Sequence, residues 1–182
     1  MIDSKYRIAV LVDTSSGWGR RVIRGIANYG LKHGPWQISV DELGINEAMN
    51  LRPGWQGDGI IARVSNMKIY EELMALGKPI VNVSNIQLKG VDLPCVATDR
   101  NAVAQLAVQH FKERGFRNLA YCGPGELIYV KQLAKIFENL TQSMDLPCEV
   151  FQTKLKRRQN SREAERAELL SWVKNLANPV GI

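Results

Sequence analysis

The polar residues best suited to chemistry in this sequence follow short apolar runs. Asp13, Thr14, Ser15 and Ser16 come directly after the run Ile8–Val12. Hydroxyl groups donate and accept hydrogen bonds and a carboxylate accepts them, so this tetrad suits a ligand that carries several hydroxyl groups, such as a sugar. Capping of the following helix is the alternative for Ser15 and Ser16.

Five further residues extend this set of candidates. Trp18 could stack on the apolar face of a sugar ring, or could simply pack inside the protein. Arg20 could reach into a binding cleft, or could lie on a helix surface. Arg63 closes a buried run, where its charge needs a partner. Ser84 and Asn85 end another run, in the same plane as the first.

Asp99 stands where the apolar run Cys95–Ala97 gives way to a helical pattern. One face of that helix carries Val103, Leu106, Ala107 and Phe111. Gly115 ends the helix and Leu119–Cys122 begins a buried strand. We therefore expect Asp99 at the carboxyl end of a buried strand, where open α/β sheets bind their ligands. N-capping of the helix is the alternative function for Asp99.

Enzymatic chemistry has little support in the sequence. Gly17-x-Gly19-x-x-Val22 approaches the dinucleotide-binding glycine pattern, but the third glycine is missing and two bulky residues intervene. A nucleotide-dependent oxidoreductase is thus a weak alternative. Asp13 has no second carboxylate nearby for phosphoryl transfer, and no Ser-His-Asp or Cys-His arrangement is visible. We expect no catalytic activity and no cofactor.

Composition points to an ordinary globular protein of 182 residues, with 45% hydrophobic and 23% charged residues. The net charge of +6 is spread along the chain, which favours a solvated surface over a nucleic-acid interface. Three distant cysteines and two histidines predict reduced thiols and no zinc site. The first apolar run is too short for a secretion signal and no membrane span is visible, which favours a cytoplasmic protein.

Strand and helix patterns alternate along the chain, which predicts an α/β fold with a parallel sheet covered by helices on both faces. The expected strands are 7–13, 36–40, 59–64, 80–84 and 119–122. The helices between them centre on 22–27, 70–76 and 103–111, and 47–51 is expected to form a short helix.

The remainder of the chain is less regular. A helix over 127–144 ends at Pro147, a short strand covers 149–152, and a helix with apolar residues between 164 and 176 ends at Pro179. Val180 to Ile182 would begin another strand. Because a domain rarely ends on the first residues of a buried strand, we expect the sequence to be truncated.

The central stretch resembles the effector-binding domain shared by the lactose/galactose repressor family and the xylose operon regulators. The resemblance rests on Thr98-Asp99, Arg114-Gly115-Phe116-Arg117 and Ala120-Tyr121-Cys122-Gly123. The first third is similar to the xylose regulators in particular, at 20–26, Gly34-Pro35-Trp36 and 55–62.

This resemblance implies a periplasmic-binding-protein-like fold, with residues 1–146 as the N-terminal lobe and 147–182 as the start of the second. It implies a transcription regulator that senses a monosaccharide, with xylose suspected, by lobe closure. It also implies a homodimer that contacts operator DNA through a C-terminal domain beyond Ile182. A sugar-binding protein without a DNA-binding role remains the alternative.

One position departs from the pattern of the family. In relatives, the helix after Gly123 often carries an aromatic residue, then an arginine that binds the sugar, and then a Gly-Phe or Ala-Phe pair. Tyr129 matches the aromatic residue and Ile136-Phe137 matches the pair, but Leu133 stands in place of the arginine. Tyr129 is therefore a ligand candidate by resemblance, and the identity of the sugar stays open.

Overall fold

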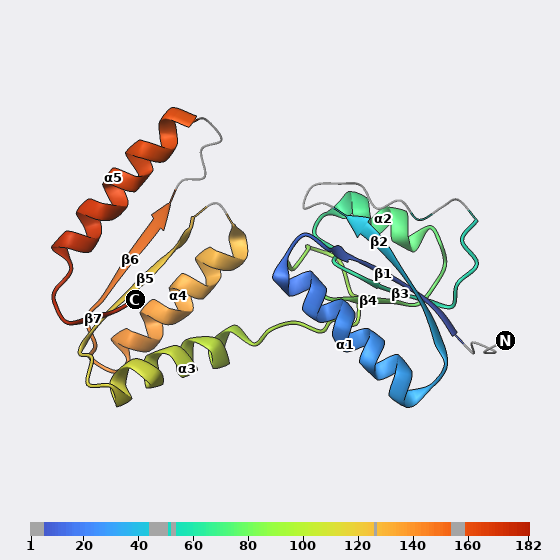
Figure 1. The fold of residues 1–182 in the computed structure, drawn as a ribbon, viewed down its shortest axis with the longest axis horizontal. Helices are drawn as coiled ribbons and strands as arrows, with labels where there is room; N and C mark the ends of the chain where they lie inside the picture. The colour runs from blue at the N-terminus through green and yellow to red at the C-terminus, as the bar shows by residue number, and fades with distance from the viewer. Residues whose placement is uncertain (1–5, 44–50, 52–53, 126, 154–158) are drawn as a thin grey trace. The chain divides into compact units, whose positions relative to one another are not determined.

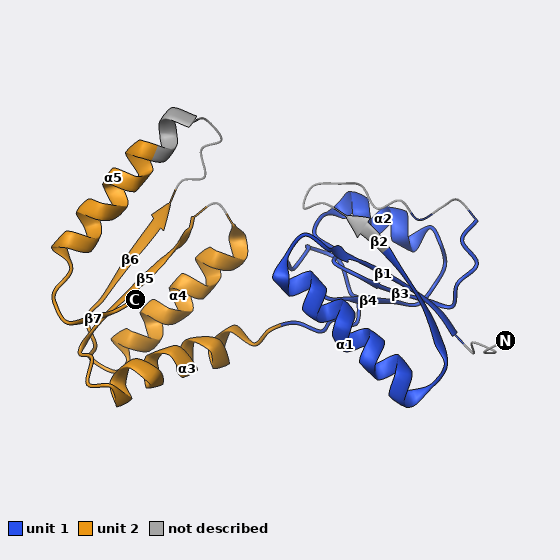
Figure 2. Ribbon diagram, in the orientation of Figure 1, with its two compact units in different colours: residues 1–97 blue, residues 98–182 orange. Residues whose placement is uncertain are grey.

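A computed structural model describes residues 6–43, 51, 54–125, 127–153 and 159–182. The described chain forms two compact units, residues 1–97 and 98–182 (Figure 2). Each unit has its own parallel sheet. The α/β fold with parallel strands predicted from the sequence is therefore confirmed.

The first unit contains a four-stranded sheet in the order β2-β1-β3-β4 (Figure 1). Its strands and helices are β1 (Tyr6–Asp13), α1 (Gly17–His33), β2 (Trp36–Leu43), β3 (Gly59–Ala62), α2 (Met67–Met74) and β4 (Ile80–Asn82). Because β1 connects to β2 on one side and β3 to β4 on the other, right-handed crossovers place α1 and α2 on opposite faces of the sheet.

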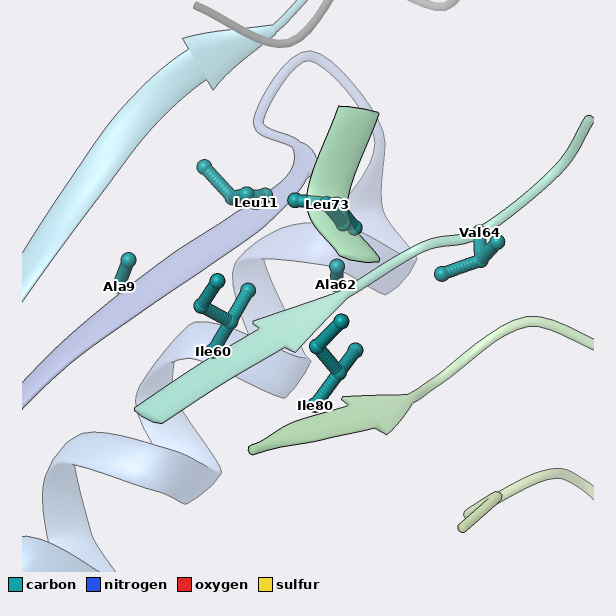
Figure 3. Packing of buried hydrophobic residues seen from close by; sticks show 7 residues of the cluster. All are labelled: Ala9, Leu11, Ile60, Ala62, Val64, Leu73 and Ile80. Atoms are coloured by element: carbon teal, nitrogen blue, oxygen red, sulfur yellow. The ribbon is translucent and has the colours of Figure 1, made fainter. Parts of the chain in front are cut away.

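The core of the first unit follows from the alternation of side chains along its strands. Ala9 and Leu11 of β1 point to the same face as Ile60 and Ala62 of β3, and Leu73 of α2 covers them (Figure 3). The other face of β1 carries Val10 and Val12, which are also buried. A run of consecutive apolar residues is what a strand covered on both faces requires.

The second unit contains a three-stranded sheet in the order β6-β5-β7. Its elements are α3 (Arg100–Glu113), β5 (Asn118–Pro124), α4 (Ile128–Gln142), β6 (Cys148–Thr153), α5 (Gln159–Asn175) and β7 (Val180–Gly181). Ala104 and Val108 of α3, Leu119 of β5 and Phe137 of α4 form its buried core. On β6, Phe151 stacks against Trp172 of α5 with ring centroids 5.1 Å apart.

The division between the units differs from the boundary near residue 146 expected from the sequence. The physical reason is strand pairing. β5 pairs with β6 and β7, and no strand pair among the described residues joins it to the sheet of the first unit. Helix α3 packs on α4 and β5, so the second unit begins at Thr98.

The expected strand end at Cys95–Ala97 is also wrong. Cys95 forms a single isolated bridge to Asn82, and Val96 is 68% exposed. One bridge at the margin of β4 is too little pairing to bury the residues that follow. The expected short helix at 47–51 lies almost wholly outside the described residues, and Leu51 itself is not helical.

Candidate functional site

The loop between β1 and α1 is organised by Asp13, which is 5% exposed. Its Oδ1 accepts hydrogen bonds from the Ser15 amide at 2.9 Å and the Ser15 hydroxyl at 2.6 Å. The bond from the Ser15 hydroxyl lowers the pKa of Asp13, although burial acts in the opposite direction. Asp13 therefore carries a charge that the loop itself stabilises.

The two serines have different functions in this loop. Ser16 is the N-cap of α1, because its Oγ accepts a hydrogen bond from the Gly19 amide at 3.0 Å. The Ser15 hydroxyl instead donates its hydrogen bond to Asp13. Arg20 folds back onto the same loop, where Nη1 donates to the carbonyl oxygens of Thr14 at 3.1 Å and Ser15 at 2.7 Å. The exposed Arg20 thus fixes the loop backbone.

Arg63 and Trp18 meet beside this loop. Arg63 follows β3, and its amide donates to the carbonyl of Leu11 at 2.9 Å, which sets it next to the end of β1. Its guanidinium carbon lies 6.0 Å from the centroid of the Trp18 ring. A cation over an aromatic face at this distance is attracted by the ring. The partner expected for the half-buried charge of Arg63 is therefore an indole.

Asn82 ties the ends of β3 and β4 together. The side chain is buried, and its Oδ1 accepts hydrogen bonds from the amides of Val64 at 3.1 Å and Ser84 at 2.8 Å. Ser84 is 4% exposed, and its Oγ accepts from the Ile86 amide at 3.1 Å. Sequence reasoning missed Asn82, although a polar residue inside the apolar run Ile80–Val83 was a usable signal.

Six candidate ligand contacts lie in the first unit. They stand at the carboxyl ends of β1, β3 and β4, which meet at one edge of the sheet. They are Asp13, Thr14, Trp18, Arg20, Arg63 and Ser84. This strand-end cluster offers hydroxyl, guanidinium and indole groups at one edge of the sheet.

Asp99 and Tyr129 belong to the second unit. Asp99 is exposed and is the N-cap of α3, since its Oδ1 accepts hydrogen bonds from the amides of Asn101 at 2.9 Å and Ala102 at 3.0 Å. Tyr129 lies in the first turn of α4 and is 36% exposed. The capping alternative for Asp99 is therefore realised in the structure.

Metal-binding clusters and membrane-spanning helices are both absent from the described part of the chain. There, no group of three His, Cys, Asp or Glu residues could hold a metal ion. No helix among those residues is long and apolar enough to cross a membrane.

A comparison with protein families matches residues 7–101, just over half of the chain, to the XylR N-terminal domain. The chain belongs to this family. The matched range includes all of the strand-end cluster and ends inside the first turn of α3.

Curated relatives of this chain are xylose operon regulatory proteins. The protein of Escherichia coli K12 is 28% identical over 127 residues, which cover 68% of this chain and 32% of that protein. The protein of Haemophilus influenzae is 26% identical over 190 residues, which cover 100% of this chain and 48% of that protein. The chain therefore spans between about a third and a half of the length of these relatives.

Solved structures share the fold. A structure of the xylose-binding transcription activator xylR superposes with a TM-score of 0.78 at 24% identity, over 99% of this chain and 46% of that one. A LacI family regulator from Enterococcus faecium with bound ribose gives a TM-score of 0.61 at 20% identity, over 91% and 63% of the two chains.

Proposed function

We propose that this chain is the effector-sensing part of a sugar-responsive transcription regulator, and that its effector is a monosaccharide, first of all xylose. The observation that carries this proposal is the family match over residues 7–101, because that range includes the whole strand-end cluster. The relatives that align with the chain are named as regulators of the xylose operon.

The chemistry of the strand-end cluster suits a sugar. A ring hydroxyl needs a donor and an acceptor, which Thr14 and Ser84 can supply through their own hydroxyls. Arg63 brings fixed donors, and Trp18 brings an apolar face for the carbon skeleton. Asp13 and Arg20 contribute mainly by holding the loop in shape.

Asp99 and Tyr129 are the proposed contacts from the second unit. The hydrogen bonds of the α3 cap both end on Oδ1 of Asp99, so Oδ2 is the oxygen proposed to accept from a sugar hydroxyl. A hydrogen bond to a charged acceptor contributes about 1.5–3 kcal/mol.

The proposed mechanism is lobe closure. A sugar that binds one lobe arrangement about tenfold better than another shifts the equilibrium by roughly 1.4 kcal/mol. In a cytoplasmic homodimer, that shift would reorient DNA-binding domains on the operator. The operator contact belongs to a C-terminal domain outside this chain.

Calorimetric titration of the longer gene product with D-xylose tests the sugar, with D-ribose, L-arabinose and D-glucose as comparisons, because this chain alone is expected to bind a sugar far more weakly. Xylose is expected to bind. The Arg63→Gln variant is expected to bind xylose more weakly, because the substitution removes the charged hydrogen-bond donors beside Trp18. Lys68→Gln is the matched control, since Lys68 is an exposed cation on α2. Failure of all four sugars to bind would contradict the proposal.

The contribution of Asp99 is tested with two variants in the same titration. Asp99→Asn keeps an acceptor for the α3 cap and loses the charge, whereas Asp99→Ala loses both. If Asp99 contacts the sugar, both variants bind xylose more weakly, and only Asp99→Ala lowers the melting temperature strongly. Unchanged xylose affinity in both variants would make Asp99 a helix cap alone.

A DNA footprint with this chain completes the test. The 182-residue chain is expected to give weak, salt-sensitive binding and no protected operator. The longer gene product should protect one operator and respond to the sugar. Sugar binding without any operator contact in the longer product would instead favour the alternative, a sugar-binding protein with no DNA-binding role.

A further inference from the structure

Asn82 stands at the last position of β4, where the pairing between β3 and β4 ends. Beyond the strand pairs themselves, the Val83 amide still donates to the Ala62 carbonyl at 2.8 Å. The amide of Val64, two residues further along, donates instead to the side-chain Oδ1 of Asn82 at 3.1 Å. A carboxamide thus takes the place of a backbone carbonyl, so the two chains can separate here without leaving this buried amide unpaired.

The same oxygen fixes the turn that carries Ser84. Oδ1 of Asn82 accepts from the Ser84 amide at 2.8 Å, with the two-residue spacing of an Asx turn. Oγ of Ser84 accepts from the Ile86 amide at 3.1 Å, so the direction of the hydroxyl is set as well. The backbone of Asn82 is held separately, because its amide donates to the Pro94 carbonyl at 2.8 Å and its carbonyl accepts from the Val96 amide at 2.9 Å.

The anchoring of Val64 also sets the direction of Arg63. Ile60, Ala62 and Val64 belong to one buried core, so side chains still alternate between the two faces of the sheet as far as Val64 (Figure 3). Arg63 therefore points to the opposite face, where its guanidinium carbon lies 6.0 Å from the centroid of the Trp18 ring. Without an acceptor for the Val64 amide, the backbone of 63–64 would be free to rotate and the guanidinium would leave this position.

We propose that Asn82 is the positioning residue of the strand-end cluster, and that it holds Arg63 and Ser84 in the geometry that binds a sugar. The identity of the ligand rests on the proposed function. Asparagine suits this position because one neutral oxygen with two lone pairs can accept from both amides without burying a charge. Groups that are already held in their binding geometry lose less entropy when the ligand arrives, so Asn82 raises affinity without touching the sugar.

The Asn82→Ser variant separates the two hydrogen bonds of the side chain. A serine hydroxyl can still accept from the amide two residues on, but it is too short to reach Val64 on the neighbouring chain. Asn82→Asp is the conservative variant, because a carboxylate oxygen takes the same place and accepts from both amides. Asn66→Ser is the matched control, since exposed Asn66 caps α2 by accepting from the Ile69 amide at 3.0 Å, and serine caps helices equally well.

The first readout needs no sugar. In the 182-residue chain, NMR follows the indole N–H signal of Trp18, which is assigned by its absence from the Trp18→Phe variant. Asn82→Ser should move this signal by more than its linewidth, because the guanidinium beside the ring is displaced. Asn82→Asp and Asn66→Ser should leave the signal in place. Loss of stability alone would not move it, since the chemical shift reports the folded state.

The second readout is xylose affinity, measured by calorimetry on the longer gene product at a temperature where every variant is folded. Asn82→Ser should weaken xylose binding by about tenfold, the size of effect expected when one hydrogen bond to the ligand is lost. Asn82→Asp should keep most of the affinity, because both amides keep their acceptor. Asn66→Ser should bind xylose as the wild-type protein does.

Three outcomes would overturn the proposal. They are an unmoved Trp18 signal in Asn82→Ser, wild-type xylose affinity in that variant, and equal changes in Asn82→Ser and Asn82→Asp. The last result would make Asn82 a packing residue. A wild-type protein that binds none of the sugars would contradict the proposed function instead, and the Trp18 signal would still decide whether Asn82 positions Arg63.

Discussion

Asp13, Arg20 and Asp99 show how closely binding and structural functions overlap at single residues. Each has the chemistry of a ligand contact, and each makes hydrogen bonds to the backbone of its own loop or helix. The sequence predicts where such side chains stand, because they follow apolar runs. It does not predict how many hydrogen bonds these side chains already make to nearby backbone groups, since that number depends on the geometry of the turn.

The charge of Asp13 is expected to stabilise the first unit. Asp13→Asn keeps the acceptor for Ser15 but loses the charge, and charge-assisted hydrogen bonds are stronger than neutral ones. The free energy of unfolding should fall by about 1 kcal/mol near neutral pH. Urea unfolding of the two proteins measures this difference.

The pH dependence of that difference follows from the lowered pKa of Asp13. A carboxyl group whose pKa is lower in the folded chain than in the unfolded chain stabilises the fold above the unfolded value, about 3.9. This contribution is lost as the pH falls through the lower folded value. The two proteins should therefore become equally stable in acid, and a difference that grew on acidification would contradict this account.

Asn82 is the residue that sequence reasoning failed to select. Its side-chain oxygen accepts hydrogen bonds from Val64 and Ser84, which follow two strands that are separated in sequence. A strand pattern indicates which residues are buried, but it does not indicate which backbone groups at two strand ends lack partners. Those partners become visible only when the register of β3 against β4 is known.

At the scale of elements, the glycines of α1 explain the near-match to a dinucleotide pattern. Gly19 is buried, and a Cβ at this position would lie 1.7 Å from the carbonyl oxygen of Asp13. Gly19 therefore lets α1 approach the end of β1. Close helix–strand packing is one function of glycines in dinucleotide-binding loops, and it needs no dinucleotide.

Gly19→Ala is expected to destabilise the first unit, because the nearest neighbour is backbone and cannot rotate away. Overpacking of this kind typically costs about 1–3 kcal/mol, and a backbone clash belongs at the upper end or beyond. Gly25→Ala is the matched control on the same helix, since a Cβ added at Gly25 would meet no atom within 4 Å.

The control should change stability in the opposite direction. Alanine in place of an exposed helical glycine stabilises by about 0.5–1 kcal/mol. Chemical unfolding followed by circular dichroism measures both variants. Equal effects of the two substitutions would show that helix propensity, and not the contact with Asp13, decides the result.

The order of strands and helices was largely predictable from the sequence. The apolar runs within 7–13 and 59–64 and the alternating run 36–40 each become a strand within a few residues of the expected bounds. The run at Cys95–Ala97 is equally apolar but pairs through one residue. Apolar character marks a possible strand, whereas pairing depends on a neighbour that the local sequence does not specify.

At the scale of the whole molecule, two separate cores replace the larger N-terminal lobe expected from the sequence. One contains Leu11 and Ala62 of the first sheet, and the other contains Val108 and Phe137 of the second unit. The sequence predicts helices and strands of similar character on both sides of residue 98. It therefore cannot indicate which sheet a given strand joins.

The last prediction tests whether the two cores stabilise their own units. Leu11→Ala removes a side chain that is 1% exposed from the first core, and Phe137→Ala removes one that is 4% exposed from the second. Each substitution leaves a cavity, which typically costs about 2–5 kcal/mol for leucine and about 3–5 kcal/mol for phenylalanine. Native-state hydrogen exchange can follow β1 and β3 separately from β5 and β6. Leu11→Ala is expected to accelerate exchange in the first pair of strands and Phe137→Ala in the second. The reason is that each cavity is surrounded by atoms of one core. If either substitution accelerated exchange equally in both pairs, the two units would unfold as one cooperative body, and the assignment of one core to each unit would not describe their stability.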